Sequence, residues 1–210
     1  MGMGMEQIID FGEVAIFWLM GFASVLALAV FFERLIVYNK ANSKSEEVME
    51  VIISKLRSQE ISSLSELVTK YPKSIYARFA AFTVSFYDRG PEYLQEIMES
   101  KSIEEKIQLE KRLPILSTLG NNAPFLGLLG TVLGVIKAFN NLGTLGSSGA
   151  EVVMKSISVA LLATAAGLFV AIPVVMANNY FNKKAKVIGQ NLEILTKEFL
   201  ATYVLTKVSN

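Results

Sequence analysis

The chain of 210 residues contains no cysteine and no histidine. Without cysteine it can form no disulfide, no iron–sulfur cluster and no thiol nucleophile. Without histidine it lacks the commonest metal ligand and the side chain that most often transfers protons near neutral pH. Any chemistry must therefore rest on carboxylates, hydroxyls, lysines or the side chains of a partner. We expect no cofactor, no metalloenzyme and no nucleophilic hydrolase.

Charged side chains are also missing from three long stretches, residues 14–32, 113–136 and 156–182. A helix needs about 20 apolar residues to cross the bilayer core, so each stretch predicts a transmembrane helix. The composition agrees, because 52% hydrophobic residues and a mean hydropathy of +0.43 exceed those of a typical soluble domain. The net charge of +1 gives no reason to expect a nucleic-acid partner.

These stretches predict an all-α membrane protein with three transmembrane helices extended into a cytoplasmic helical domain. In the polar region, apolar residues such as Val48, Ile52 and Leu56 recur at helical spacing, and Pro91 is expected in the first turn of a long helix. The predicted segments are an amino-terminal periplasmic segment (1–13), transmembrane helix 1 (14–38), a cytoplasmic helical domain (39–112), transmembrane helix 2 (113–139), a periplasmic connector (140–155), transmembrane helix 3 (156–181) and a cytoplasmic helical tail (182–210). We expect the third transmembrane helix to continue into the tail without a break.

Basic residues gather where the predicted spans meet the polar domain and the tail. They are Arg34, Lys40, Lys44, Lys106, Lys111, Arg112, Lys183, Lys184 and Lys186. Because basic residues near span ends stay on the cytoplasmic side, we expect the amino terminus and the connector outside and the carboxyl terminus in the cytosol. Lys137 and Lys155, at the edges of the connector, are interpreted as interfacial anchors.

Small residues recur along the second and third predicted spans at spacings of three, four and seven, which puts most of them on one helix face. They are Ala123, Gly127, Gly130 and Gly134 in the second span and Ala160, Gly167 and Ala171 in the third. Small residues let helix backbones approach closely in lipid, so we predict that these two faces pack against other helices. A direct role of the glycines in permeation is the alternative.

Thr131 and Thr164 are singled out because the second and third spans contain no ionisable side chain. A hydroxyl can orient water and pass hydrogen bonds, but it does not titrate in the relevant range. If protons cross here, a titratable group must come from another chain. In the alternative interpretation, each threonine bonds its own backbone carbonyl one turn back. Pro173 is expected to kink the third span, with neighbouring helices or water compensating the lost backbone bond.

Two sequence motifs carry a resemblance to a known family. The stretch APFLGLLGTVLG at residues 123–134, followed by Ala138 and Phe139, resembles the second-span signature of the ExbB/TolQ/MotA proton-channel family. The stretch ALLATAAGLFVAIP at residues 160–173 is similar to the third-span signature of that family. The predicted order of segments also resembles the ExbB and TolQ branches more than the four-span MotA branch.

The resemblance implies a multi-pass inner-membrane stator of Gram-negative bacteria. In that family several copies, usually five, form a ring around the transmembrane helices of two single-span partner subunits of the ExbD/TolR type. Proton flow along that interface powers work on TonB or TolA. The family's pore-facing threonines correspond to Thr131 and Thr164 here.

The chain departs from the family at one position. ExbB and TolQ members often carry a glutamate five residues before the third-span threonine, and this position is Val159 here, with Ser156 and Ser158 nearby. The aspartate that the family's partner subunit carries in its single span would then do all the titrating. This implication agrees with the need for an outside titratable group that the residues themselves indicate.

The leading functional hypothesis is a non-enzymatic channel subunit of a proton-driven motor. Two alternatives stay open. The first is a scaffold that holds a single-span partner without ion flux. The second is a membrane enzyme, for which Glu104, Glu105 and Glu110 form a local carboxylate cluster. Because Lys106 and Lys111 alternate with these glutamates, we interpret the cluster as a solvated, salt-bridged helix face.

Overall fold

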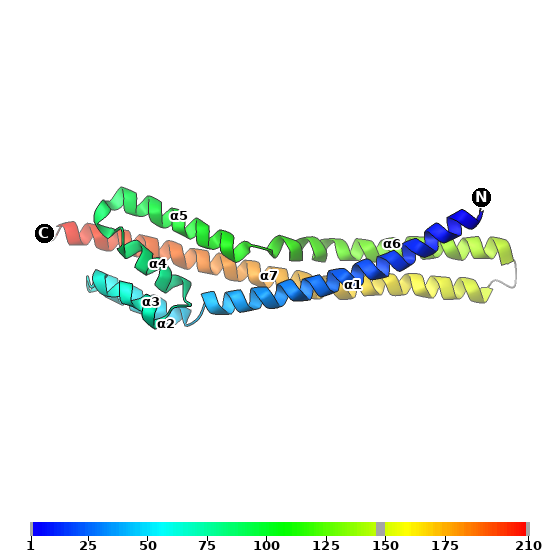
Figure 1. The fold of residues 1–210 in the computed structure, drawn as a ribbon, viewed down its shortest axis with the longest axis horizontal. Helices are drawn as coiled ribbons and strands as arrows, with labels where there is room; N and C mark the ends of the chain where they lie inside the picture. Colours follow the sequence, from blue (N-terminus) through cyan, green and yellow to red (C-terminus); the bar gives the residue numbers. More distant parts are fainter. Residues whose placement is uncertain (1, 146–149, 209–210) are drawn as a thin grey trace. The chain divides into compact units, whose positions relative to one another are not determined.

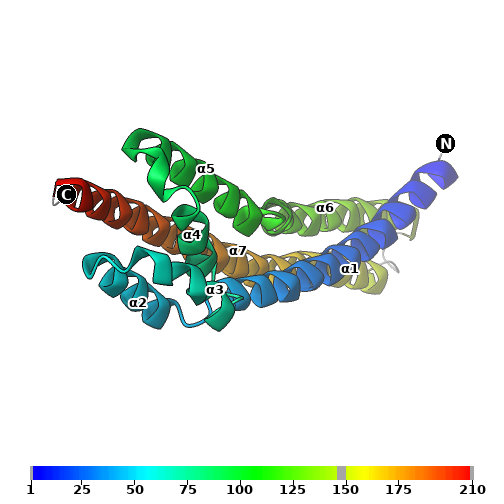
Figure 2. The same ribbon diagram turned by 60° about the vertical axis from the view of Figure 1, so that its left-hand side comes forward.

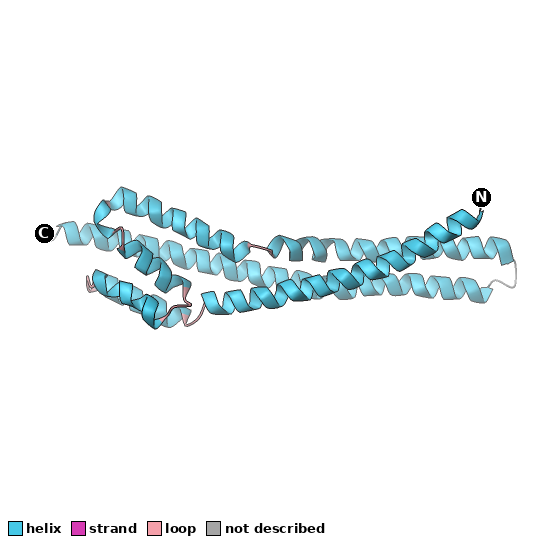
Figure 3. Cartoon of the chain, viewed as in Figure 1, coloured by secondary structure: helices cyan, strands magenta, loops and turns pink. Residues whose placement is uncertain are grey.

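The computed structural model describes residues 2–145 and 150–208, and within these residues every regular element is a helix (Figure 3). The elements are α1 (Gly2–Ala41), α2 (Ser45–Arg57), η1 (Ile61–Glu66), α3 (Leu67–Lys70), α4 (Ile75–Val84), η2 (Tyr87–Arg89), α5 (Pro91–Glu110), α6 (Leu113–Leu145) and α7 (Ala150–Val208). The predicted all-α fold is confirmed for the described part of the chain. Pro91 lies in the first turn of α5, as predicted.

Among the described residues, three helices are long and apolar enough to cross a membrane, and they are α1, α6 and α7. They exceed the predicted spans: α1 already begins at Gly2, and α6 continues into the predicted connector to Leu145. Each added residue extends the ladder of backbone hydrogen bonds, so polar main-chain groups near lipid are satisfied internally. Residues 146–149 of the connector lie outside the described residues.

Helix α7 runs unbroken to Val208, which confirms that the third apolar helix continues into the tail. Pro173 lies inside this helix. A proline has no backbone N–H and crowds the carbonyl one turn back, which is why a kink is predicted at this position. The kink at Pro173 stays a prediction.

The chain divides into two compact units. Unit 1 comprises residues 1–32 and 112–180, in which segments of α1, α6 and α7 lie side by side (Figures 1 and 2). Alanines such as Ala123 and Ala163 contribute many of its buried side chains, together with larger ones such as Ile16. Other large apolar side chains, such as Phe125 and Phe169, point outward, the latter 80% exposed. An apolar exterior of this kind fits an environment of lipid or neighbouring helices.

Unit 2 comprises residues 33–111 and 181–210 and has an ordinary hydrophobic core. The side chains of Val48, Ile52 and Leu56 on α2 are fully buried, as are large side chains of α4. The tail of α7 contributes a stripe at helical spacing, in which Ile188, Leu192, Leu195 and Phe199 are buried. Both periodic patterns are therefore packing seams within this unit.

Arg34 is a buried charged residue of unit 2, with 4% of its surface exposed. Its Nη1 donates to the carbonyl oxygens of Gln108 and Leu109 at 3.3 and 3.4 Å, and its Nη2 contacts Glu33 Oε1 at 2.7 Å. The two carbonyls belong to the last turn of α5, where helical acceptors have no partner within the helix. Arg34 therefore caps α5 with a positive charge, at the end where the helix dipole is negative.

We expect Arg34→Met to lower the free energy of unfolding by about 2–3 kcal/mol, since it removes charged hydrogen bonds from buried carbonyls. The matched control is Arg57→Met, because Arg57 pairs with Glu198 at 2.9 Å but its side chain is 70% exposed. Surface pairs of this kind contribute about 0–1 kcal/mol. Thermal unfolding of the purified protein in detergent compares the two variants. Equal losses would contradict the capping role of Arg34.

Candidate pore-lining site

The small residues of α6 and α7 meet each other inside unit 1. A Cβ built on Gly127 would lie 2.8 Å from the Ala163 carbonyl oxygen and 3.0 Å from Thr164 Cα. A Cβ built on Gly167 would lie 2.7 Å from the carbonyl oxygen of Ala123. Real side chains do not approach backbone atoms this closely, so the two helices are in backbone contact at this level.

The same contact continues along the two helices toward the end of α6 and the start of α7. A Cβ built on Gly130 would lie 2.6 Å from the Ala163 side chain, and one built on Gly134 would lie 2.5 Å from the Ala160 side chain. The structure thus brings the predicted small residues of both spans together. Ala171, further along α7, is also buried, with 4% of its surface exposed.

Thr131 and Thr164 lie beside this contact and are both half-buried in the single chain. The Thr164 hydroxyl donates across to the Gly127 carbonyl oxygen at 3.1 Å and lies 3.4 Å from Thr131 Oγ1. The Thr131 hydroxyl donates to the Leu128 carbonyl oxygen, one turn back on its own helix, at 2.6 Å. The two threonines therefore form one hydroxyl pair across α6 and α7.

The hydrogen-bond partners determine what this hydroxyl pair can offer to another molecule. A hydroxyl has one hydrogen to donate and two lone pairs that accept. The Thr131 hydroxyl has an acceptor in the Leu128 carbonyl, and the Thr164 hydroxyl has one in the Gly127 carbonyl or in Thr131 Oγ1. Lone pairs are therefore what the two oxygens retain for another molecule. A water molecule or a protonated carboxyl group can donate to them, whereas an ionised carboxylate has no hydrogen to donate.

Val159 stands on α7 where the family pattern often has glutamate, and it is 38% exposed. The nearby Ser156 is buried, and its hydroxyl donates to the Val152 carbonyl oxygen of its own helix at 3.0 Å. Neither side chain titrates. This part of α7 therefore supplies no proton acceptor in place of the glutamate.

Lys137 makes a charged contact between α6 and α1 that the sequence did not indicate. Its Nζ lies 2.6 Å from Asp10 Oδ1 and 3.0 Å from Glu13 Oε2. The Glu13 side chain is only 13% exposed, whereas that of Asp10 is 59% exposed. A Cβ on Gly134 would lie 3.3 Å from Glu13 Oε1, so the carboxylate packs on the small-residue face of α6.

We expect Lys137→Met to destabilise the protein by about 1–3 kcal/mol, because it leaves the Glu13 carboxylate poorly solvated and without its cation. Asp10→Asn is the matched control, since the Asp10 carboxylate is well exposed and should cost much less. The charge exchange Glu13→Lys with Lys137→Glu should recover part of the loss. Thermal unfolding in detergent measures all of these variants, and a larger loss for Asp10→Asn than for Lys137→Met would contradict the assignment.

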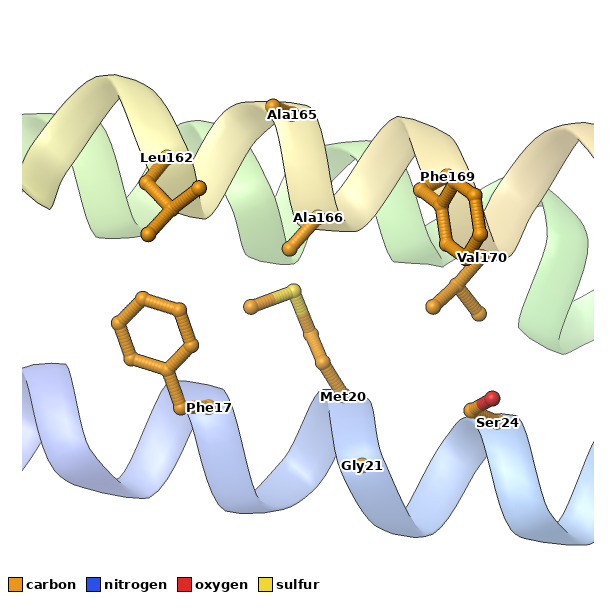
Figure 4. Close-up of a pocket in the computed structure, with 9 residues that line it drawn as sticks. All are labelled: Phe17, Met20, Gly21, Ser24, Leu162, Ala165, Ala166, Phe169 and Val170. Atoms are coloured by element: carbon orange, nitrogen blue, oxygen red, sulfur yellow. The ribbon is translucent and has the colours of Figure 1, made fainter.

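An open pocket of about 420 Å³ lies between α1 and α7 in unit 1 (Figure 4). Its lining consists of Phe17, Met20, Gly21, Ser24, Leu162, Ala165, Ala166, Phe169 and Val170. None of these side chains is ionisable, and Ser24 alone among them carries a hydroxyl. By helical spacing the α7 residues of this lining lie on the side away from Thr164. The pocket and the hydroxyl pair are therefore separate features of α7.

The carboxylates of Glu104, Glu105 and Glu110, which the enzyme alternative would use, form ion pairs within unit 2. Glu104 and Glu105 contact Lys101 Nζ at 2.9 and 3.3 Å, and Glu105 also contacts Arg78 at 3.3 Å. Burial lowers the pKa of Lys101, but hydrogen bonds to the two carboxylates more than offset it, so its pKa is raised. The face was predicted to be solvated and salt-bridged. The ion pairs are present, but Glu105 is not solvated, since it lies on the buried face of α5 and is 9% exposed.

Sequence reasoning missed two members of the small-residue contact. Ala163 is 2% exposed and faces both Gly127 and Gly130, and Gly120 lies against Val175 of α7, 2.8 Å from a built Cβ. Both follow the spacing that identified their neighbours. Within the described residues, no cluster of three or more acidic side chains could hold a metal ion.

Comparison with known proteins assigns the chain to a family. The MotA/TolQ/ExbB proton channel family matches residues 72–194, which include the hydroxyl pair and the small-residue contact. The "Biopolymer transport protein ExbB" of Helicobacter pylori strain J99 is 28% identical over 194 residues, covering 92% of this chain and 97% of that protein.

Shorter matches of higher identity occur in other bacteria. The protein of the same name from Neisseria gonorrhoeae is 45% identical over 83 residues, covering 40% of this chain and 38% of that protein. The one from Xanthomonas campestris pv. campestris strain B100 is 40% identical over 92 residues, covering 44% of this chain and 36% of that protein. These relatives support the resemblance to the ExbB branch. The chain is a bacterial inner-membrane protein that belongs to the MotA/TolQ/ExbB proton channel family.

Proposed function

We propose that this chain is the channel or stator subunit of an inner-membrane motor driven by the proton-motive force. With a single-span partner of the ExbD/TolR type it would energise transport or envelope work that depends on TonB or TolA. Family membership, the ExbB names of the relatives and three apolar helices of sufficient length support this proposal. The basic residues at the span ends favour a periplasmic amino terminus and a cytoplasmic carboxyl terminus.

The observation that carries the proposal is the hydroxyl pair. Thr131 and Thr164 are 3.4 Å apart in the charge-free stretches of two helices, and both hydroxyls have acceptors within this chain. The pair therefore accepts hydrogen bonds at a depth where no side chain of the second or third span titrates. An aspartate on a guest helix would supply the missing titratable group.

The arrangement couples the protonation of a guest carboxyl group to movement. An ionised side chain is costly inside a membrane, so the guest aspartate is held near water while it carries a charge. Once protonated, it becomes neutral and can donate to the lone pairs of the hydroxyl pair. The guest helix can then move relative to the ring. Release of the proton on the other side would complete the cycle.

A ring of several copies, five by the family resemblance, would enclose the guest helix. Contacts between unlike faces of identical chains close into rings when the rotation allows it. The role proposed for this chain is non-enzymatic: it holds hydroxyls, excludes lipid and transmits force, and the cytoplasmic carboxylates serve in ion pairs with Lys101 and Arg78.

A non-conducting scaffold for the single-span partner is the second candidate. It is favoured by Val159, since the chain lacks the glutamate often found at this position. The two functions differ in their response to a proton gradient. A scaffold would hold the partner without passing protons, and a protonophore would not alter the output of the partner.

Reconstitution tests the proposal directly. The chain and its single-span partner are assembled in liposomes that contain a pH-sensitive dye, and proton uptake is recorded after a potential is imposed. We expect uptake that is lost when the partner's aspartate is replaced by asparagine. No uptake with either form would favour the scaffold. Equal uptake by liposomes with the asparagine variant would show that protons cross without the partner's aspartate, and this would contradict the proposed mechanism.

A further inference from the structure

Helix α5 has an exposed apolar face that its own unit does not cover. Leu94, Met98 and Leu109 are buried in unit 2, whereas Ile103 and Ile107 on the opposite side are 59% and 61% exposed. Tyr93 and Ser100 extend this exposed face toward the start of the helix. The exposed glutamates beside it are Glu92, Glu96 and Glu99, and the exposed Lys106 lies beside Ile103 and Ile107 and contacts Glu110 at 3.9 Å. We call these residues the acidic α5 face.

The tail of α7 has a second exposed face with the opposite charge. Val187 and Ile194 are each 46% exposed and Leu205 is 64% exposed, although the other side of the tail is buried in unit 2. Their spacing, with Ala201 between them, follows the heptad that is typical of a helix that packs against another helix. The exposed lysines beside this stripe are Lys183, Lys186 and Lys197; Glu193, the one exposed acid among them, contacts Lys197 Nζ at 2.8 Å. We call these residues the basic α7 face.

Residues of the two faces can be compared by their distance along the helix axes of α5 and α7 within unit 2, which we call their height. Tyr38 fixes the level, because its hydroxyl donates to the Leu109 carbonyl oxygen at 3.0 Å and its ring stacks on Phe181 at 5.2 Å. From this anchor, α5 and the α7 tail extend alongside each other (Figures 1 and 2). Ile103 lies about 9 Å along α5 from Leu109, and Val187 lies about 9 Å along α7 from Phe181. The two residues therefore have the same height.

Further from the anchor, opposite charges reach the same height. Glu92 and Lys197 both lie about 25 Å along their helices, and Glu96 lies about 20 Å along, level with Ile194. Copies related by rotation about an axis parallel to these helices would keep these heights. The apolar residues of one face would then meet those of the other, and Glu92 and Glu96 would approach Lys197.

We propose that the acidic α5 face of one copy packs against the basic α7 face of the next copy. This inference rests on the ring assumed in the proposed function and names the surfaces that close it in unit 2. A second copy is the occupant because one chain carries both halves of a complementary pair, and both halves point away from their own core. The contact is head-to-tail, so each copy would use one face toward each neighbour, as a closed ring requires.

Cysteine cross-linking tests this contact, and the chain has no cysteine of its own to interfere. One copy carries Ile103→Cys and a second, differently tagged copy carries Val187→Cys; the two are co-expressed and oxidised in membranes. We expect a covalent dimer that contains both tags. Copies that carry both substitutions should give a ladder of products up to the full ring. Ser62→Cys paired with Val187→Cys is the control, since Ser62 is exposed in unit 2 but belongs to neither face.

Charge reversal provides the second measurement. Glu92→Lys with Glu96→Lys in the copy that carries Ile103→Cys should cause loss of the mixed dimer, and Lys197→Glu in the copy that carries Val187→Cys should restore it. A merely unfolded variant would not recover in this way. Dimers formed by either single-cysteine copy alone would overturn the proposal, since they indicate a two-fold contact between like faces.

The native mass of the solubilised assembly separates failure of this inference from failure of the proposed function. A particle with the mass of a ring but without the mixed cross-link would show that the copies meet through other surfaces, and this overturns the α5–α7 contact while the proposed function stands. A particle with the mass of a single copy would overturn both.

Discussion

Replacing both hydroxyls, by Thr131→Val and Thr164→Val, is expected to reduce proton uptake in the reconstituted assembly by about 100-fold, while the protein remains folded and assembled. Valine has nearly the shape of threonine, so the packing of α6 on α7 is retained and the acceptor oxygens are removed. Two lost hydrogen bonds of about 1–1.5 kcal/mol each correspond to roughly this change in rate. The measurement is dye-reported proton uptake, with native mass as the check on assembly.

Serine provides the matched control for the hydroxyl pair. Thr131→Ser and Thr164→Ser keep the oxygens and remove only methyl groups, so uptake should stay within a few fold of the original protein. A small effect of both valines, with assembly intact, would mean that the hydroxyls serve only α6–α7 packing. A large effect of the serines would mean that the methyl groups, not the oxygens, matter.

The second large effect is expected from the closest backbone contact. Gly127→Ala and Gly167→Ala each add a Cβ that would lie under 3.0 Å from a carbonyl oxygen of the facing helix. The helices must separate to admit it, at a cost of about 1–3 kcal/mol. Because the two glycines also contact each other, the double variant should cost less than the sum of the single variants. Thermal unfolding in detergent measures these losses.

Gly21→Ala is the matched control for this prediction. Gly21 lies in an apolar helix of the same unit, and a Cβ there would meet nothing within 4 Å. Alanine is also the better helix former, so the variant should be unchanged or more stable by about 0.5–1 kcal/mol. If Gly127→Ala and Gly167→Ala were as stable as Gly21→Ala, the close packing of α6 on α7 would be contradicted.

Helical periodicity and missing charge were sufficient to predict most of the fold. The stretches without charge correspond to parts of α1, α6 and α7, Pro91 begins α5, and Ile188 and Leu192 face the core of unit 2. These features depend on local sequence, because helix formation and amphipathic packing repeat every few residues. The small-residue spacing likewise identified which faces of α6 and α7 carry the contact.

Features that depend on contacts distant in sequence were not predictable in this way. Lys137 was interpreted as an interfacial anchor, and only the arrangement of α1 beside α6 brings it to Asp10 and Glu13. Glu105 was assigned to a solvated face, but the packing of α5 on α4 buries it beside Arg78. Charge patterns along one helix cannot distinguish such pairs from solvated ones.

The hydroxyl pair shows the same division between local and distant information. The sequence left open whether each threonine bonds its own helix. In the structure the two threonines differ. The Thr131 hydroxyl donates to the Leu128 carbonyl of its own helix, whereas the Thr164 hydroxyl donates to the Gly127 carbonyl of the facing helix. The second bond exists because the glycine lets the backbone of α6 come within reach. Close packing and hydroxyl placement are therefore parts of one arrangement.

The most direct test of the central claim is a structure, determined in a lipid environment, of the chain assembled with its single-span partner. The account predicts that Thr131 and Thr164 face the partner's helix, with its carboxyl group within hydrogen-bond reach of their oxygens or linked to them through one water. Hydroxyls that face lipid, or a centre filled by this chain's own side chains with no space for a partner helix, would contradict it.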